Sequence, residues 1–346
     1  MKIVIAGAGY AGTVAANRLA KKAKDADITV VNPYADFVER VRMHEMITGS
    51  GTATRRLSDV LHERVTLRVA VVEKIGDDVV SLSDGTDLDY DRLIYAVGSS
   101  RTAPAGTLSV GGLDSARAAA EQFAALPPRS TVTVVGGGLT GIETASEVAT
   151  ERKDLKVKLV SEDEVGFSLS DTARDRVVRV LTELGVETVR GRWSPDGADL
   201  TLWAVAGAVN TLAARCGLRT NADGLVVVDE FLRSTSHPTV YAVGDGAAVP
   251  GTRMSCQAAL PQGTHAANNV IREMRDADPK AFSMAFVGQN VSLGRRNGVI
   301  QAAKRDDTPI GAWFGGRPAA EFKELVCKGA AWTAEHGTYA WLPGPR

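Results

Sequence analysis

Cysteine is scarce in this chain of 346 residues, and no two of its three cysteines are close in sequence: Cys216, Cys256 and Cys327. The spacing contains no C-x-x-C motif, which argues against the usual dithiol redox site, and no pattern typical of a zinc site. Isolated cysteines favour free thiols in a reducing compartment over structural disulfides. The sequence therefore predicts a cytoplasmic protein without a paired redox cysteine.

An excess of charge of either sign is also missing. The chain has 40 Lys and Arg against 41 Asp and Glu, a formal net charge of -1 at pH 7. This balance does not favour a nucleic-acid surface or a polybasic membrane patch, so we expect no nucleic acid as a partner. The histidines are scattered and predict no metal site: His44, His62, His237, His265 and His336.

Long hydrophobic runs are absent too. No window approaches the ~20 uninterrupted apolar residues that a membrane-spanning helix needs. The first predicted strand begins at Lys2, which leaves no room for a signal peptide. The C-terminal stretch AAWTAEHGTYAWLPGPR is rich in aromatic residues. We expect it to pack as an ordinary tail, with a peripheral membrane contact or a homodimer contact as the open alternative.

The opening phrase MKIVIAGAGYAGTVAANRLA has the pattern of a strand, a glycine turn and a helix. In such a turn Gly7 permits the tight exit from the strand, Gly9 lets a diphosphate approach the backbone, and Gly12 allows close helix packing. A second strand ends at Asn32, where an acid usually binds a ribose hydroxyl. Asparagine can still hydrogen-bond a hydroxyl, and Glu39 and Arg40 are candidates to assist it.

The phrase VTVVGGGLTGIETASEVA repeats this pattern, with Gly136, Gly138 and Gly141 as the turn. Glu143 follows near the positive end of the predicted helix. Two interpretations of this acid stay open. It interacts with the helix dipole, as acids near a helix start usually do, or it faces a nicotinamide or flavin.

The strand after the second turn leads into Ser161, Glu162, Asp163 and Glu164. An acid at this point favours a free 2'-hydroxyl and repels a 2'-phosphate. Three acids without a neighbouring Arg or Lys in the sequence therefore favour NADH over NADPH, with Glu162 as the candidate residue. The alternative is a solvated acidic loop.

Two further phrases echo each other: LIYAVGSS around Gly98 and VYAVGDGAA around Gly244 and Asp245. An Asp after such a glycine can accept a hydrogen bond from a polyol hydroxyl. Because the two phrases flank the second glycine turn, the second nucleotide-binding unit is predicted to be inserted into the first. The predicted fold is α/β, with two Rossmann-like domains and a small C-terminal α+β region.

Together, GAGYAG, YAVGSS, VVGGGLTGIETASEVA and VYAVGDGAA resemble the pyridine nucleotide-disulfide oxidoreductase superfamily of flavoproteins. The phrases HAANNV, SLGRRNGVIQ and FGGRPAAEFKELV look like its type II NADH dehydrogenase branch, including forms close to ferroptosis-suppressor and apoptosis-inducing-factor-like oxidoreductases. The resemblance covers nearly the whole chain. It implies an FAD domain (1–105 and 235–280), an NAD(P)H domain (106–234) and a C-terminal region (281–346).

The resemblance also implies roles for single residues. The first turn and Asn32 would meet the FAD diphosphate and adenosine ribose, and Asp245 the FAD ribityl chain. The second turn would meet the diphosphate of NAD(P)H, with Glu143 close to the nicotinamide as the candidate catalytic residue. Near the isoalloxazine ring the resemblance implies a helix start: Gln257, Ala258 and Ala259. His44 follows the FAD ribose strand, and packing is favoured for it over a flavin contact.

The missing cysteine pair argues against disulfide-reductase and sulfide:quinone reductase activity. The sequence thus predicts an FAD-dependent enzyme that takes a hydride from NADH and passes electrons to a quinone or another small acceptor. Two alternatives stay open: an FAD-dependent oxidase or dehydrogenase of one small metabolite, and a redox-sensing binding protein with slow turnover.

Overall fold

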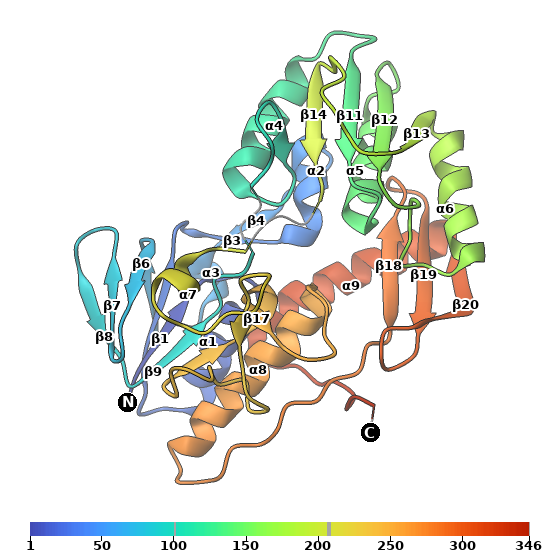
Figure 1. Cartoon of the computed structure of the whole chain (residues 1–346). Helices are drawn as coiled ribbons and strands as arrows, with labels where there is room; N and C mark the ends of the chain where they lie inside the picture. The colour runs from blue at the N-terminus through green and yellow to red at the C-terminus, as the bar shows by residue number, and fades with distance from the viewer. Residues whose placement is uncertain (100–101, 206–208, 346) are drawn as a thin grey trace.

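The computed structural model describes residues 1–99, 102–205 and 209–345, which form two lobes with a third, smaller sheet beside them (Figure 1). The first lobe is built on a parallel five-stranded sheet. In spatial order its strands are β16 (Val240–Ala242), β9 (Arg92–Tyr95), β1 (Lys2–Ala6), β2 (Asp27–Asn32) and β5 (Val65–Val69).

The second lobe has its own parallel five-stranded sheet. Its strands are β10 (Leu108–Ser109), β14 (Leu200–Trp203), β11 (Thr131–Val135), β12 (Lys156–Ser161) and β13 (Val186–Arg190). The chain completes this sheet between β9 and β16, and β16 then pairs with β9 in the first lobe. The predicted fold class, with the second unit inserted into the first, is therefore confirmed.

The third sheet is antiparallel and consists of β18 (Gly288–Ser292), β19 (Gly298–Ala303) and β20 (Pro309–Gly315). Shorter pairings complete the strands: β3 (Asp36–Val38) with β4 (Thr54–Arg56), β6 (Val72–Ile75) with β7 (Val79–Leu82) and β8 (Asp87–Asp89), and β15 (Val226–Val227) with β17 (Ala247–Ala248).

The α-helices of the described residues are α1 (Tyr10–Lys22), α2 (Met43–Thr48), α3 (Leu57–Val60), α4 (Leu113–Ala125), α5 (Leu139–Glu151), α6 (Asp171–Glu183), α7 (Leu212–Arg215), α8 (Cys256–Glu273) and α9 (Arg317–His336). Two single 3-10 turns are η1 (Arg40–Arg42) and η2 (Gly244–Gly246).

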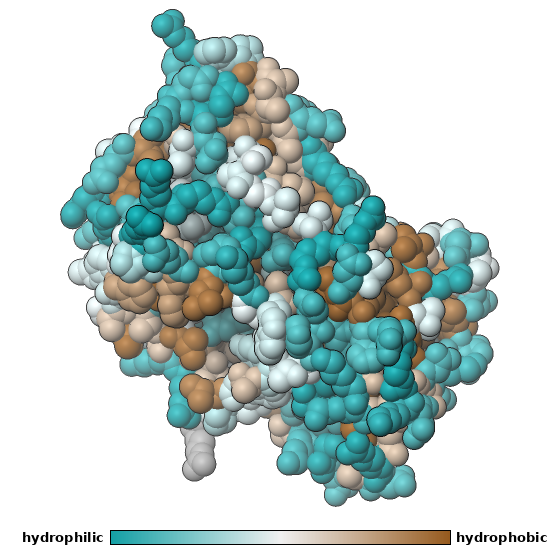
Figure 2. All heavy atoms as spheres, turned by 180° about the vertical axis from the view of Figure 1, so that it is seen from behind, coloured by the Kyte–Doolittle hydropathy of each residue, from teal (hydrophilic) through white to brown (hydrophobic). Residues whose placement is uncertain are grey.

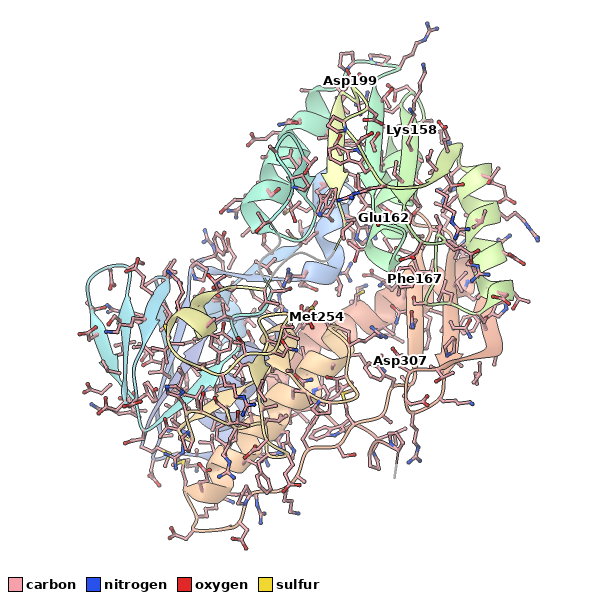
Figure 3. The ribbon with its side chains drawn as sticks, in the orientation of Figure 1. Lys158, Glu162, Phe167, Asp199, Met254 and Asp307 are labelled. Atoms are coloured by element: carbon pink, nitrogen blue, oxygen red, sulfur yellow. The ribbon has the colours of Figure 1, made fainter. Side chains whose placement is uncertain are left out.

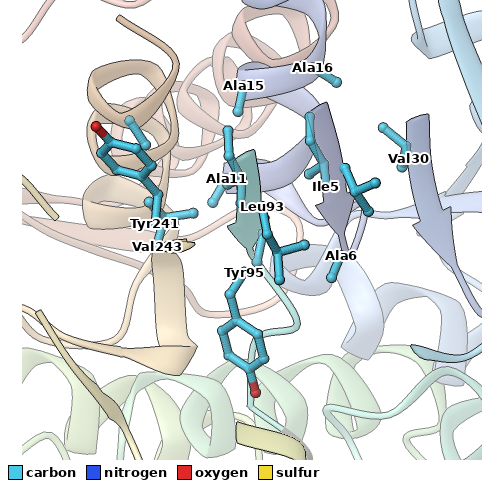
Figure 4. Close-up of a cluster of buried hydrophobic side chains, with 14 of the residues drawn as sticks. Ile5, Ala6, Ala11, Ala15, Ala16, Val30, Leu93, Tyr95, Tyr241 and Val243 are labelled. Atoms are coloured by element: carbon cyan, nitrogen blue, oxygen red, sulfur yellow. The ribbon is translucent and has the colours of Figure 1, made fainter. Parts of the chain in front are cut away.

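The core of the first lobe lies on both faces of its sheet, as expected for parallel strands covered by helices. Figure 4 shows Ile5 and Leu93 from adjacent strands, with the rings of Tyr95 and Tyr241 nearby. All four side chains are buried. The second lobe has a separate core, which also takes in Met43 and Ile47 of α2 from the first segment of the chain.

Helix α1 is enclosed by segments that are distant in sequence. A Cβ added to Gly263 of α8 would lie 2.2 Å from the carbonyl oxygen of Ala11, so only glycine allows this approach. Helix α9 ends at His336, and the next residue, Gly337, has a φ of 58° and lies against Asn17 and Arg18 of α1. These contacts hold α1 near its start, at Ala11, and in its second half, at Asn17 and Arg18, and the first glycine turn lies just before the helix.

The outward side of α9 carries exposed apolar side chains: Phe322, Leu325, Val326 and Trp332. On the rear face of the molecule, brown hydrophobic groups are set among larger teal and white areas (Figure 2). Within the described ranges, no helix combines the length and the apolar character that crossing a membrane requires. The residues after α9 pack on the body of the protein, with Trp341 Nε1 donating to the Ser283 carbonyl oxygen at 2.8 Å.

Candidate functional site

The first glycine turn forms a cradle at the start of α1. Gly7 has a φ of 102°, which side-chain-bearing residues rarely adopt. A Cβ on Gly12 would lie 1.9 Å from the Gly7 carbonyl oxygen, whereas a Cβ on Gly9 would project into open space. Helix α1 has no acid in its first turn and no side chain capping its N-terminus. Its free N–H groups therefore suit a diphosphate at Gly9.

Asn32 lies at the end of β2, beside this turn, and is 9% exposed. Its Oδ1 accepts a hydrogen bond from the Ala8 amide at 3.0 Å, and its Nδ2 donates to the Tyr34 carbonyl oxygen at 2.8 Å. The amide thus fixes the glycine loop, and the second hydrogen of Nδ2 remains for a ribose hydroxyl. Arg40 lies elsewhere: its guanidinium is 3.7 Å from Asp245.

The two echoing phrases meet at the ends of adjacent strands. Gly98 and Gly244 have φ values of 74° and 71°. Ser99 Oγ donates to Asp245 at 3.3 Å, and Gln262 Oε1 accepts from the Gly244 amide at 2.7 Å. A cavity of about 280 Å³ opens here, and three residues predicted from the sequence line it: Gly244, Asp245 and Ala258.

Gln257 follows the start of α8. Its amide lies within hydrogen-bonding distance of the Val287 nitrogen, at 3.0 Å, and of the Gly288 oxygen, at 3.1 Å. Ala258 is buried, and its amide is capped by Ser255 Oγ at 3.2 Å. Gln257 therefore connects α8 to the third sheet, while Ala258 lines the cavity.

The second glycine turn has the same construction. Gly136 has a φ of 119°, and a Cβ on Gly141 would lie 1.8 Å from the Gly136 carbonyl oxygen. A Cβ on Gly138 would have only the Phe167 ring nearby, at 3.9 Å. Helix α5 begins at Leu139 without an acid in its first turn. This turn can therefore hold a second diphosphate.

The acidic loop after β12 consists of Glu162, Asp163 and Glu164. Its surroundings differ from those expected from the sequence. Glu162 is exposed, and Figure 3 shows it with Phe167 at the end of the second lobe that faces Met254. No basic residue neighbours the loop in sequence, but the fold brings two arginines to Glu164. Arg174 lies 3.2 Å and Arg190 lies 3.8 Å from its carboxylate. The acids therefore lack basic neighbours in the sequence but not in the folded structure, so this part of the argument for NADH does not hold in space.

Glu143 is the fifth residue of α5, further into the helix than the sequence suggested. It is 6% exposed, and its Oε1 pairs with Lys323 Nζ of α9 at 2.9 Å. Ser292 donates to the same oxygen from its amide, at 2.9 Å, and from its hydroxyl, at 3.2 Å. Burial opposes ionisation of Glu143, but the charges of Lys323 and His44 and the Ser292 amide outweigh it, so the pKa is lowered.

Lys323 was not identified from the sequence. Burial acts to lower its pKa, but the Glu143 carboxylate outweighs burial, so the pKa is raised and the ammonium stays charged. Tyr10 and Cys327 lie in the same region, and the Tyr10 hydroxyl is buried with no hydrogen-bond partner among the described residues. The structure thus holds a charged pair between α5 and α9 and an unpartnered buried hydroxyl at the start of α1.

A second set of ion pairs continues from this site. Arg295 bridges Glu147 of α5, at 2.7 Å, and Glu45 of α2, at 2.9 Å. Arg42 then bridges Glu45, at 3.1 Å, and Glu324 of α9, at 2.9 Å. This network joins the first segment of the chain, the second lobe and the C-terminal helix.

His44 lies inside this network and is 3% exposed. Burial lowers its pKa, although the carboxylates of Glu143, Glu147 and Glu45 act in the opposite direction. The packing role favoured from the sequence and a contact with a cofactor are both compatible with this position.

The cysteines are all free thiols. Burial raises the pKa of both the Cys256 and the Cys327 thiol, and the charge of Cys327 adds to the effect on Cys256. Cys216 lies elsewhere, where its sulfur accepts a hydrogen bond from the Ile75 amide at 3.2 Å. Across the described ranges, no three His, Cys, Asp or Glu residues are grouped to hold a metal ion.

The residues of the first lobe fit an FAD. The open side of Gly9 leaves room for a diphosphate against free helix N–H groups. Asp245 in the cavity offers a carboxylate acceptor for polyol hydroxyls. When bound, FAD would exchange a hydride with a nicotinamide and return electrons to an acceptor.

The comparisons with known proteins agree with this geometry. The family model for pyridine nucleotide-disulphide oxidoreductases matches residues 1–193 and 195–263. An "NADH dehydrogenase-like protein" of Mycobacterium tuberculosis is 30% identical over 352 residues, which cover 86% of this chain and 87% of that protein. Ferroptosis suppressor protein 1 of Xenopus laevis is 26% identical over 333 residues, covering 87% and 88% of the two chains.

Two solved structures share the fold. The sulfide:quinone oxidoreductase of Aquifex aeolicus has a TM-score of 0.80 at 16% identity, covering 97% of this chain and 92% of that one. NDH2 of Plasmodium falciparum in complex with NADH has a TM-score of 0.79 at 15% identity, covering 97% and 96%. The family match, the relatives and the two glycine turns lead to one conclusion: this chain is an enzyme of the pyridine nucleotide-disulphide oxidoreductase family, NADH dehydrogenase-like.

Proposed function

We propose that this enzyme oxidises NADH through bound FAD and passes the electrons to a small quinone. The overall change is NADH + H⁺ + quinone → NAD⁺ + quinol, so one proton must reach the acceptor in addition to the hydride. The observation that carries the proposal is the buried Glu143–Lys323 pair, with 2.9 Å between Oε1 and Nζ. It places groups that can hold a proton beside the second glycine turn.

The chain's own residues divide the remaining tasks. The turn at Gly7, Gly9 and Gly12 would hold the FAD diphosphate, and Asp245 would bind its ribityl chain. The second turn would hold NADH, and Glu143 would orient the nicotinamide, since alignment contributes most to a hydride transfer. Glu162, exposed after β12, would bind the adenosine ribose and favour NADH.

The protonation state of the Cys256 and Cys327 thiols favours a quinone over a disulfide or sulfide substrate. Burial raises the pKa values of Cys256 and Cys327, so both stay protonated and are poor nucleophiles. Lys323 carries a charged N–H donor and Tyr10 an unpartnered hydroxyl, and each can donate a hydrogen bond to a quinone oxygen.

The test is anaerobic stopped-flow reduction of the FAD-loaded protein, followed by reoxidation. We expect NADH to bleach the flavin faster than NADPH does. A water-soluble benzoquinone should then restore the colour at least about tenfold faster than air-saturated buffer, since the buried donors favour quinone. Glu143→Gln should slow both half-reactions.

Other outcomes would contradict the proposal. If the protein bound no flavin even after incubation with FAD, the proposed function would be wrong. Fast reduction by one small metabolite, with little by NADH, would support a metabolite dehydrogenase. A stable reduced complex with negligible turnover would support a redox-sensing role.

A further inference from the structure

Helix α9 has two apolar faces, and one of them is exposed. On the inner face, Cys327 and Ala334 are buried against the body of the protein. On the outer face, Leu325 is 65% and Trp332 is 54% exposed. A helix of a soluble protein normally has one apolar stripe, which faces the core. The second face therefore marks a surface that contacts another molecule.

The outer face has the spacing by which two helices pack on each other. Its residues follow at steps of four, three, four and three and are all exposed: Pro318, Phe322, Leu325, Gly329 and Trp332. This alternation of three and four is the heptad spacing of paired helices. We call these residues the outer stripe, and it runs along most of α9, which ends at His336.

The apolar surface continues from the outer stripe onto the third sheet. The rings of Phe322 and of Phe314 in β20 meet edge to face, with 6.1 Å between their centroids. Phe314 and Ile310 are exposed, and β20 contains no charged residue. Figure 1 shows β20 at the outer edge of this sheet. Charged side chains commonly protect edge strands, so an uncharged edge beside an apolar helix indicates a contact with protein.

Charged residues flank the outer stripe and make it self-complementary. Glu321 and Lys328 are seven positions apart on one side of it. Two copies of α9 that pack antiparallel about a two-fold axis would bring each Glu321 opposite the partner's Lys328. Phe322 of each copy would then lie opposite the partner's Leu325. A parallel arrangement would instead place like charges opposite each other, which is unfavourable.

We propose that the outer stripe and the edge of β20 form the interface of a symmetric homodimer, in which α9 packs antiparallel on α9 of a second copy. A two-fold contact joins the same patch of both subunits, so it requires a surface that matches itself, as this one does. The inference is independent of the proposed function.

The charges around the outer stripe favour a second copy over a lipid surface. Apolar helix faces that bind anionic lipid are bordered by Lys and Arg. The border of the outer stripe instead balances two cations against two anions: Arg317 pairs with Glu321 at 2.9 Å, and Lys328 pairs with Glu324 at 3.3 Å. Since these ion pairs are largely exposed, they are weak and can rearrange when a partner binds.

The test is sedimentation velocity of the whole FAD-loaded chain from about 1 to about 100 µM, a range that covers dimers of moderate affinity. We expect the mass to rise from the 36.5 kDa of one chain to twice that value. Leu325→Glu should raise the dimer dissociation constant about a hundredfold, because it buries two like charges near the two-fold axis. Leu342→Glu is the matched control. Leu342 is 53% exposed but lies in the tail after α9, so the constant should stay within about twofold.

A loss of the dimer can be separated from a loss of folding. Lys323 faces the opposite side of α9, where it pairs with Glu143. The flavin content and the circular dichroism spectrum of Leu325→Glu should therefore match those of the parent protein.

A charge-exchange experiment tests the antiparallel arrangement. Glu321→Lys and Lys328→Glu should each raise the dissociation constant about tenfold, because like charges then face each other twice across the axis. In an equimolar mixture the two variants should pair with each other about as tightly as the parent does, since every contact again joins opposite charges. A role of either side chain within its own helix does not predict this recovery.

Three results would overturn the inference. The parent keeps the mass of one chain at the highest concentration, Leu325→Glu dimerises as well as the parent, or the mixed charge variants associate no better than either one alone. A parent that stays monomeric but sediments with phosphatidylcholine vesicles would show that a lipid surface covers the outer stripe instead.

Discussion

The helices behind the two glycine turns, α1 and α5, are both 13 residues long and are anchored by opposite chemistry. In α1 the buried anchor is neutral. Asn17 Nδ2 donates to the carbonyl oxygens of Val60 and Ala334, both at 2.9 Å, and Asn17 Oδ1 accepts from the His62 amide at 2.7 Å. In α5 the buried anchors are two carboxylates, Glu143 and Glu147, paired with Lys323 and Arg295.

This difference shows that one backbone design serves two purposes. A neutral anchor does not change with pH and adds no field at the turn, which suits a cofactor that stays bound. A charged anchor needs its partners in place, since an unpaired buried carboxylate is costly. It also puts an ionised carboxylate and its protonated lysine partner next to the site where, in our proposal, the nicotinamide binds and leaves.

The largest effect is expected from replacing the third glycine of each turn with alanine. In Gly12→Ala and Gly141→Ala the new Cβ would lie 1.9 Å and 1.8 Å from a backbone oxygen. Each turn must then open, at a cost of about 3 kcal/mol or more. We expect Gly12→Ala to lose its flavin and Gly141→Ala to keep flavin but lose reduction by NADH. The flavin-to-protein ratio and the rate of bleaching measure the two effects.

A suitable control is Gly329→Ala on the exposed side of α9, where an added Cβ meets nothing within 4 Å. It should change stability by no more than about 1 kcal/mol, in the stabilising direction, because alanine favours a helix. Equal loss of flavin in Gly12→Ala and Gly141→Ala would refute the assignment of different cofactors to the two turns.

The next largest effect is expected when the cation that anchors α5 is removed. Lys323→Met leaves the Glu143 carboxylate buried and unpaired, so we expect a loss of about 3–5 kcal/mol in urea unfolding at pH 7. Glu143→Gln combined with Lys323→Met should recover most of it. Because the folded-state pKa of Glu143 is lowered, its contribution is present above the unfolded-state value of about 4.3 and is lost as pH falls through the folded value. A double variant as unstable as the single one would argue against the pair.

The two glycine turns also differ in how many of their features could be predicted from the sequence. Both glycine turns, Asn32 and Asp245 are local patterns, so they could be predicted. Val65–Ile75 alternates as an antiparallel strand would, yet β5 joins the parallel sheet next to β2 and only β6 is antiparallel. Alternation reports which faces are buried but does not identify the neighbouring strand.

The charged anchors could not be predicted because their partners are distant in sequence. Lys323 lies 180 positions after Glu143 and turns inward on α9, while Arg317, Glu321 and Lys328 of the same helix are exposed. Phe322 and Leu325 are 45% and 65% exposed, while Lys323 faces the interior. A pattern-based interpretation of this helix would place the lysine in solvent. The arginines at Glu164 were missed for the same reason.

A smaller effect concerns the pH dependence of the charged anchor. His44 is packed among Glu143, Glu147 and Glu45, with Lys323 nearby, and burial lowers its pKa. The unfolded chain then binds a proton first, so stability falls as pH drops below about 6.5. We expect His44→Gln to flatten the curve of unfolding free energy against pH below about 6.5. Above that pH the curve of the variant should run parallel to that of the parent protein. Curves that stay parallel from pH 5 to 8 would contradict this.

The smallest effect tests the neutral character of the first turn. Asn32→Asp keeps the acceptor for the Ala8 amide but places a carboxylate oxygen against the Tyr34 carbonyl, where Nδ2 now donates at 2.8 Å. The lost bond and the gain from a charge near the start of α1 partly cancel, so we expect destabilisation of about 1 kcal/mol. Glu162→Gln, one position after the matching strand end of the second turn and exposed, should change stability by less than about 0.5 kcal/mol. Thermal unfolding of the two variants measures both. If Asn32→Asp were more stable than the parent, the first turn would tolerate the charge that the second one carries, and the contrast between the turns would lie in their anchors alone.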